Sequence, residues 1–270
     1  MSLRQIGRVA VSVFRESVRD RVLYSLVIFA VLLIAASYLL AQLTAGQDLK
    51  IIKDLGLAAI ATFGLFIAVF IGIGLVWKEV ERRSIYSLLA KPLRRREFVL
   101  GKYAGLALTL LVNITTMSAA FYAVLAAMAW LADDAARAGW AASALDPAML
   151  LAVALILVEL LVVTAIALFF STFSSPFLSA ALTLGVWVVG RFGDDLRHFD
   201  AVLDAPVVVA LARGLSYVLP NFAAFDIKAQ VVHGIPVDPV YVGLTVLYGW
   251  AYIGVLLAGA VVVFERRDFR

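Results

Sequence analysis

The chain of 270 residues carries few side chains that could do chemistry. It has no cysteine, which excludes disulfides, thiolate metal sites, iron–sulfur clusters and thiol nucleophiles. Its two histidines, His198 and His233, and its four methionines show no spacing typical of metal ligands. Both histidines also lie outside the long apolar segments, which argues against an intramembrane protease.

A phosphate-binding loop is missing as well. The pattern GxxxxGK[ST] does not occur, and the dipeptide Gly101–Lys102 is followed by Tyr103 and leads into an apolar segment. We therefore predict that the chain is not an enzyme by itself and binds no cofactor of its own.

One acidic residue, Glu159, lies near the centre of an apolar segment that spans residues 148–170. A carboxylate at that depth costs about 2.5–3.5 kcal/mol on insertion scales, so it should face protein or a water-filled cavity. It is either a coupling or substrate-contacting group on a translocation path, or a packing element that is protonated or hydrogen-bonded. Its expected partners in the second case are Asn113, Thr115 or Thr116, in a polar run typical of close helix packing.

The composition requires a membrane around these residues. Apolar residues make up 64% of the chain and charged residues 16%, against about 45–50% and about 25% in soluble domains. The mean hydropathy is +1.00. We predict an all-α polytopic membrane protein that forms a single transmembrane domain over residues 1–270. Its six spans are expected at about 23–43, 55–76, 103–131, 148–170, 177–190 and 240–264.

The charge distribution predicts the orientation. The N-terminal segment, residues 77–102 and the C-terminal tail together carry a net charge of +9. The segments that alternate with them along the chain, residues 44–54, 132–147 and 191–239, carry a net charge of −4. Basic residues gather on the cytoplasmic side, so both termini and the loop after the second span are predicted there. The basic balance thus reflects topology, and no nucleic-acid partner is expected.

Residues 1–21 are predicted to form a helix on the membrane surface. Arg4, Arg8, Arg15 and Arg19 fall within a roughly 60° arc, with apolar residues on the opposite side. The alternative is a basic flank that only sets the topology. A secretory signal peptide does not fit, because the apolar segment that follows is longer than the usual 7–15 residues.

The cytoplasmic loop of residues 77–98 is predicted to contain a short amphipathic helix that ends before Pro92. Such a helix could dock into a groove on a soluble partner, whereas the simpler interpretation is a solvated basic loop. The residues expected to couple to that partner are Glu79, Arg82, Arg83, Ile85, Leu88, Leu89 and Pro92.

This loop resembles the corresponding segment of permease subunits of the type-2 ABC exporters. The shared features are acidic residues, a leucine pair, a proline, basic residues, a glutamate and a Gly-Lys pair that opens the third span. The segments LPNFAAFDIKAQVVHGIPVD (219–238) and FERRDF (264–269) also look like that family. The branch that it resembles most is the one of permeases for multicopper-enzyme maturation, which includes the nitrous-oxide-reductase accessory permease.

The resemblance implies a half-transporter in a bacterial inner membrane, which pairs with a second copy of itself. Two copies of a separate ATPase would bind ATP and Mg and dock on the loop after the second span. The resemblance further implies a partly re-entrant segment within the outer residues 191–239. Membrane lipids are expected partners, and an accessory periplasmic protein is a further candidate.

Three functions remain as alternatives to export. In the first, ATP hydrolysis drives mechanical work on an extracytoplasmic partner, with the long outer segment as its anchor. The second is a secondary transporter, but the sequence shows one buried acid and no internal repeat. The third is the intramembrane protease, against which the positions of the histidines argue. The sequence does not indicate the substrate.

Overall fold

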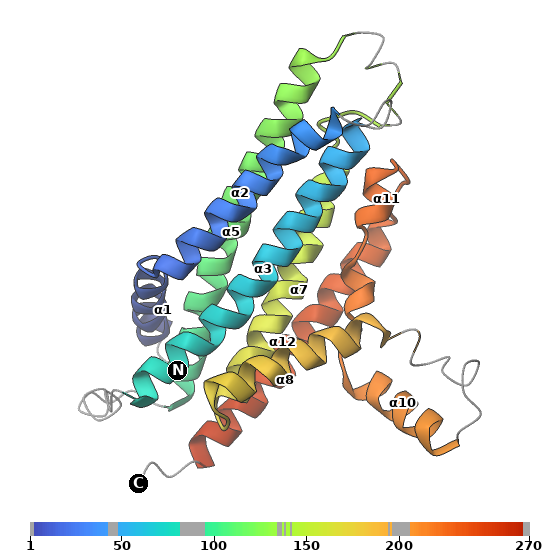
Figure 1. Ribbon diagram of the computed structural model, residues 1–270. Coiled ribbons are helices and arrows are strands. Elements are labelled where there is room, and N and C mark those ends of the chain that lie inside the picture. Colours follow the sequence, from blue (N-terminus) through green and yellow to red (C-terminus); the bar gives the residue numbers. More distant parts are fainter. Residues whose placement is uncertain are drawn as a thin grey trace.

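The described part of the chain is a series of helices. The computed structural model describes residues 3–42, 48–81, 95–133, 137, 139–140, 142–193, 195 and 206–266. Within these residues there is no β-strand, which agrees with the predicted all-helical class. The α-helices are α1 (Leu3–Ser17), α2 (Arg21–Ala41), α3 (Asp48–Glu81), α5 (Arg95–Leu131), α7 (Ala148–Ser171), α8 (Pro176–Arg191), α10 (Pro206–Val218), α11 (Lys228–Val232) and α12 (Pro239–Arg266). A 3₁₀-helix, η2 (Phe222–Phe225), precedes α11 (Figure 1).

Five of the helices, α2, α3, α5, α7 and α12, are long and apolar enough to cross a membrane. They correspond to five of the six predicted spans. The remaining one, α8, has 16 residues and is therefore about 24 Å long, less than the roughly 30 Å of a bilayer core.

Two of the long helices extend beyond the predicted spans on the side of the loop between them. Helix α3 continues to Glu81 rather than ending near residue 76, and α5 begins at Arg95 rather than at residue 103. Hydropathy marks the apolar stretch that can cross a membrane and not the end of the helix, so both helices can continue beyond the predicted spans. Glu97 in the first turn of α5 suits the positive end of a helix dipole.

The predicted coupling helix falls largely outside the described residues. Its first residues, through Glu81, continue α3, although the side chain of Glu79 is not described. Residues 82–94, with Arg82, Arg83, Ile85, Leu88, Leu89 and Pro92, lie outside the described part of the chain. Their role stays a prediction.

The amphipathic helix at the N-terminus is confirmed as a helix, α1. Its arginines at positions 4, 8, 15 and 19 are exposed, while Val13 on the opposite face is 4% exposed. The apolar face packs along the first turns of α5, with Val13 against Leu106.

The chain reverses direction between α7 and α8 within four residues. Helix α7 ends at Ser171, and Ser175 then caps α8 by accepting a hydrogen bond from the backbone N–H of Leu178. Pro176 occupies the first turn of α8, where its missing N–H leaves no helical bond unmade. This turn directs α8 back along α7.

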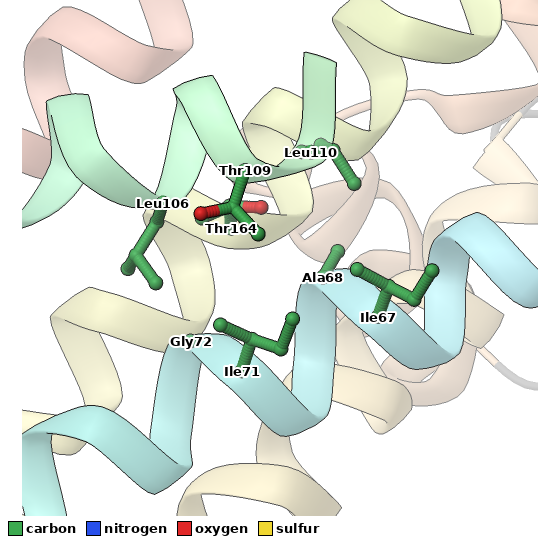
Figure 2. Close-up of a pocket in the computed structure, with 8 residues that line it drawn as sticks. All are labelled: Ile67, Ala68, Ile71, Gly72, Leu106, Thr109, Leu110 and Thr164. Carbon is green, nitrogen blue, oxygen red and sulfur yellow. The ribbon is translucent and has the colours of Figure 1, made fainter. Parts of the chain in front are cut away.

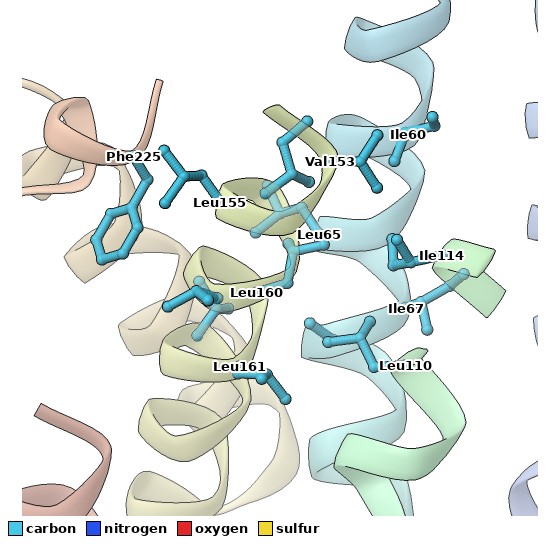
Figure 3. Close-up of a cluster of buried hydrophobic side chains, with 14 of the residues drawn as sticks. Ile60, Leu65, Ile67, Leu110, Ile114, Val153, Leu155, Leu160, Leu161 and Phe225 are labelled. Atoms are coloured by element: carbon cyan, nitrogen blue, oxygen red, sulfur yellow. The ribbon is translucent and has the colours of Figure 1, made fainter. Parts of the chain in front are cut away.

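The core lies between α3, α5 and α7 (Figure 3). Helix α7 is the most enclosed of the five candidate spans, and α12 the least. Leu160 of α7 is 1% exposed and lies over Gly64 of α3, whose lack of a side chain makes room for it. Phe225 of η2 reaches this core as well.

Leu160→Ala should destabilise the fold by about 2–5 kcal/mol, because it removes buried contacts and leaves a cavity next to Gly64. Thermal unfolding of the detergent-solubilised protein measures this loss. Leu150→Ala is the matched control, since Leu150 lies on the same helix but is 56% exposed. Equal melting temperatures for the two variants would contradict the core described here.

Candidate functional site

The first candidate site lies at the end of the bundle where α3 ends and α5 begins, which we call the inner end (Figure 1). Here α1 approaches the backbone of α5 closely at Gly101 and Gly105. A Cβ atom at Gly105 would lie 2.7 Å from the carbonyl oxygen of Ala10, and one at Gly101 would lie 2.6 Å from Val9 Cβ. These two glycines, four residues apart, thus allow α1 to pack directly against the backbone of α5.

The end of α12 is also attached to α5 at the inner end. The Arg95 guanidinium donates hydrogen bonds to the backbone oxygens of Phe264 (3.3 Å) and Glu265 (2.8 Å). The rings of Phe98 and Phe264 stack with centroids 5.8 Å apart, and the Lys102 ammonium lies 4.7 Å from the Phe98 centroid. We call Arg95, Phe98, Lys102 and Phe264 the inner cluster. It joins two of the segments that carry the family resemblance.

Lys102 also shows why Gly101–Lys102 is not a phosphate-binding loop. Both residues lie inside α5, two turns from its start, and Lys102 is 2% exposed. A phosphate-binding loop instead presents backbone N–H groups at the start of a helix. The structure therefore assigns this dipeptide to helix packing.

The second candidate site surrounds Glu159, the twelfth of the 24 residues of α7. Its Oε1 atom accepts hydrogen bonds from Trp187 Nε1 and from Arg191 Nη2, both at 2.9 Å. Arg191 Nη1 also donates to Asp226 Oδ2 at 2.9 Å, and Lys228 Nζ lies 3.2 Å from the same oxygen. These five residues, which we call the charge cluster, come from α7, α8, the C-cap of η2 (Asp226) and the first residue of α11 (Lys228).

The charge cluster is buried unevenly. The side chain of Glu159 is 4% exposed, that of Arg191 20% and that of Asp226 32%. Two carboxylates and two cations compensate one another within the charge cluster. Because Arg191 reaches the middle of α7, the C-terminal end of α8 lies beside the midpoint of that helix.

The structure corrects the predicted partners of Glu159. Asn113 Nδ2 donates to the backbone oxygen of Thr109 (2.7 Å), and Thr116 Oγ1 donates to that of Val112 (2.9 Å). Thr115 likewise bonds within its own helix, and both threonines are exposed. These short polar side chains donate hydrogen bonds to backbone oxygens of their own helix, α5. The hydrogen-bond partners of Glu159 come from α8 instead.

Sequence reasoning missed Trp187, Arg191, Asp226 and Lys228. One signal in the sequence did point to Arg191, since this residue ends an unusually short apolar segment. A span of that length that starts at one membrane surface ends inside the hydrocarbon, where its terminal arginine needs an acid. Glu159 is the acid that meets this need.

A small cavity lies between α3, α5 and α7 and has a volume of about 10 Å³ (Figure 2). Its lining is apolar apart from Thr109 and Thr164, whose hydroxyls donate to backbone oxygens of their own helices. This space is about that of one water molecule, too small for a substrate. Among the described residues, no three acidic or histidine side chains come together as metal ligands would.

Comparison with known families identifies the chain. The family model of the ABC-2 family transporter proteins matches residues 8–269. The chain belongs to this family. No curated protein matches it. The chain is thus a multi-pass membrane component of an ABC transporter, and proteins of this family work with an ABC ATPase.

Gly105→Ala should destabilise the ABC-2 protein by about 1–3 kcal/mol, since the new methyl group would meet the backbone of α1. Thermal unfolding measures the loss. Gly254→Ala on α12 is the control, because nothing lies within 4 Å of a Cβ atom there. If Gly105→Ala were as stable as this control, α1 would not be seated as described.

Glu159→Leu should destabilise the protein by about 1–3 kcal/mol, because Trp187 and Arg191 lose a buried acceptor. Glu159→Gln keeps an oxygen for these donors and should lose less. Melting temperatures of both variants, measured beside Thr116→Val as a control, test this order. Wild-type stability for Glu159→Leu would show that the carboxylate does not hold α8.

Proposed function

We propose that this chain is the membrane subunit of an ATP-driven exporter, in which two copies pair and each binds a separate ATPase. ATP and Mg would be bound by that ATPase. Membership in the ABC-2 family, together with a sequence that has no phosphate-binding loop, supports this assignment. The observation that carries the proposal is the inner cluster, in which α5 and α12 meet at Arg95, the first described residue after residues 82–94.

The inner end is suited to receive a mechanical input. An ATPase that docks on residues 82–94 would act on the end of α3 and the start of α5 together. Because α1 and α12 are fixed to α5 there, a displacement of this end would move four helices as a group. Rigid helices with closely packed ends transmit such a movement with little loss.

The proposed topology has six spans, with both termini in the cytoplasm of a bacterial cell. Helix α8 is the short fifth span. Phe222 and Phe225, which are 0% and 1% exposed, support a partly re-entrant outer segment. The exposed arginines of α1 would lie close to anionic lipid headgroups, since only three residues separate the end of α1 at Ser17 from the start of α2 at Arg21.

The resemblance of residues 77–102, 219–238 and 264–269 supports a place in the branch for multicopper-enzyme maturation. Mechanical work on an extracytoplasmic partner is the alternative function, and the length of the outer segment favours it. Uptake of labelled candidate substrates into inverted vesicles separates the two functions. ATP-dependent uptake establishes export, and ATP hydrolysis without uptake of any candidate favours mechanical work.

Co-expression with the ATPase should yield a complex that contains two copies of each chain, because neither chain alone completes the transporter. Its mass, measured by light scattering after detergent correction, tests this stoichiometry. A monodisperse permease that never retains an ATPase would contradict the proposal.

Leu88→Asp or Leu89→Asp should abolish ATPase association, since a charge in an apolar groove costs several kcal/mol. Ser87→Asp is the matched control, because the predicted helical period places Ser87 on the face opposite the leucines. Co-purification measures association, and membrane insertion should be normal in all three variants. Full association of both leucine variants would refute the docking role of this segment.

A further inference from the structure

The segment from Pro220 to His233 forms a plug that lies between α7 and α12. Phe222 and Phe225 are almost fully buried, and the ring of Phe225 packs against Tyr248 of α12 with centroids 6.1 Å apart. Helix α11, which follows in the same segment, packs against α3 and α7. This plug therefore fills space inside the bundle, at the level of the charge cluster.

The plug is attached to α12 by neutral hydrogen bonds. The backbone N–H of Asn221 donates to Tyr248 Oη at 2.8 Å, and Tyr241 Oη donates to the backbone oxygen of Ala224 at 2.6 Å. Asn221 also accepts a bond from the N–H of Ala223, which fixes the turn internally. These bonds tie the backbone of the plug to one helix and give it a defined shape.

On the opposite side, a charged contact joins the plug to α7 and α8. Arg191 donates to Asp226 of the plug and to Glu159 of α7 at the same distance, 2.9 Å. Gly190, the residue before it, allows the ring of Phe222 to approach the end of α8. The ion pair of Arg191 with Asp226 thus crosses the boundary between α8 and the plug.

The two bonds of Arg191 differ in how easily they can break. Glu159 is 4% exposed, so without Arg191 its carboxyl group would lose a buried partner that water cannot replace. Asp226 is 32% exposed and retains Lys228 at 3.2 Å, so it can release Arg191 and become hydrated. The pair with Asp226 is therefore the one that opens at lower cost.

We propose that Arg191 is a latch that holds the plug closed against α7, and that the transport cycle opens the outer side by separating Arg191 from Asp226. Throughout this movement Arg191 stays with Glu159 and Trp187. The latch deepens the proposed function of the chain as an ATP-driven permease, because it assigns an outer gate to specific residues.

The absence of cysteine from the natural chain allows a direct test. A single Val231→Cys substitution places a nearly isosteric thiol on α11, at a residue that is 0% exposed. The probe is a charged, membrane-impermeant maleimide, applied to the permease–ATPase complex in lipid nanodiscs without nucleotide. Adding Asp226→Asn should increase the labelling rate by about tenfold or more, because the labelling rate follows the open population.

Two controls make the result specific. Lys228→Gln leaves the bond between Arg191 and Asp226 in place, so labelling of Cys at position 231 should stay slow. Val163→Cys, at a core position of α7 that is also 0% exposed, should remain unlabelled in the Asp226→Asn background. Unchanged labelling at position 231, or equal acceleration at position 163, would overturn the latch.

A second arm adds ATP with a hydrolysis-deficient ATPase to the complex that carries the intact latch. Faster labelling at position 231 is expected, because the bound nucleotide opens the gate. If ATP has no effect although Asp226→Asn accelerates labelling, the latch holds the plug and the proposed ATP coupling fails. If ATP accelerates labelling as much in Asp226→Asn as in the wild-type background, the latch is overturned.

Discussion

A carboxylate in the middle of an apolar helix must find its partners inside the protein, because hydrocarbon offers neither water nor counterions. Glu159 imposes this constraint on the outer half of the bundle. It requires α8 to end beside the midpoint of α7, where Trp187 and Arg191 reach Oε1. The other terminal nitrogen of Arg191, Nη1, binds Asp226, and this contact holds the plug beside Glu159.

Helix α12 connects this charge cluster with the inner end. It runs without interruption from Pro239 to Arg266, bonds the plug through Tyr241 and Tyr248, and ends at the inner cluster on Phe264. In the proposed mechanism, a movement at the start of α5 would reach the plug through this one continuous helix. Since α12 is the least enclosed of the five candidate spans, it can move with little loss of core packing.

The helices were predictable, whereas the contacts of their polar residues were not. Apolar length placed α7 and α12 to within one or two residues of their observed ends, because the membrane thickness sets that length. Helix α5 begins at Arg95, before the predicted span at residue 103, because the helix continues beyond its apolar stretch. The pairing of Glu159 with Arg191 joins residues 32 positions apart. It depends on the angle between α7 and α8 after the turn that connects them, and no local sequence pattern encodes this angle.

In the proposed mechanism, an ATPase bound at the inner end controls the plug in the other half of the bundle. Cryo-electron microscopy of the complex in nanodiscs, nucleotide-free and ATP-bound, tests it most directly. We expect the ATPase to lie against residues 82–94 in both states. The contact of Arg95 with Phe264 should persist, and the contact of Arg191 with Asp226 should be present only without nucleotide. An ATPase bound elsewhere, or a contact of Arg191 with Asp226 that is the same in both states, would contradict the account.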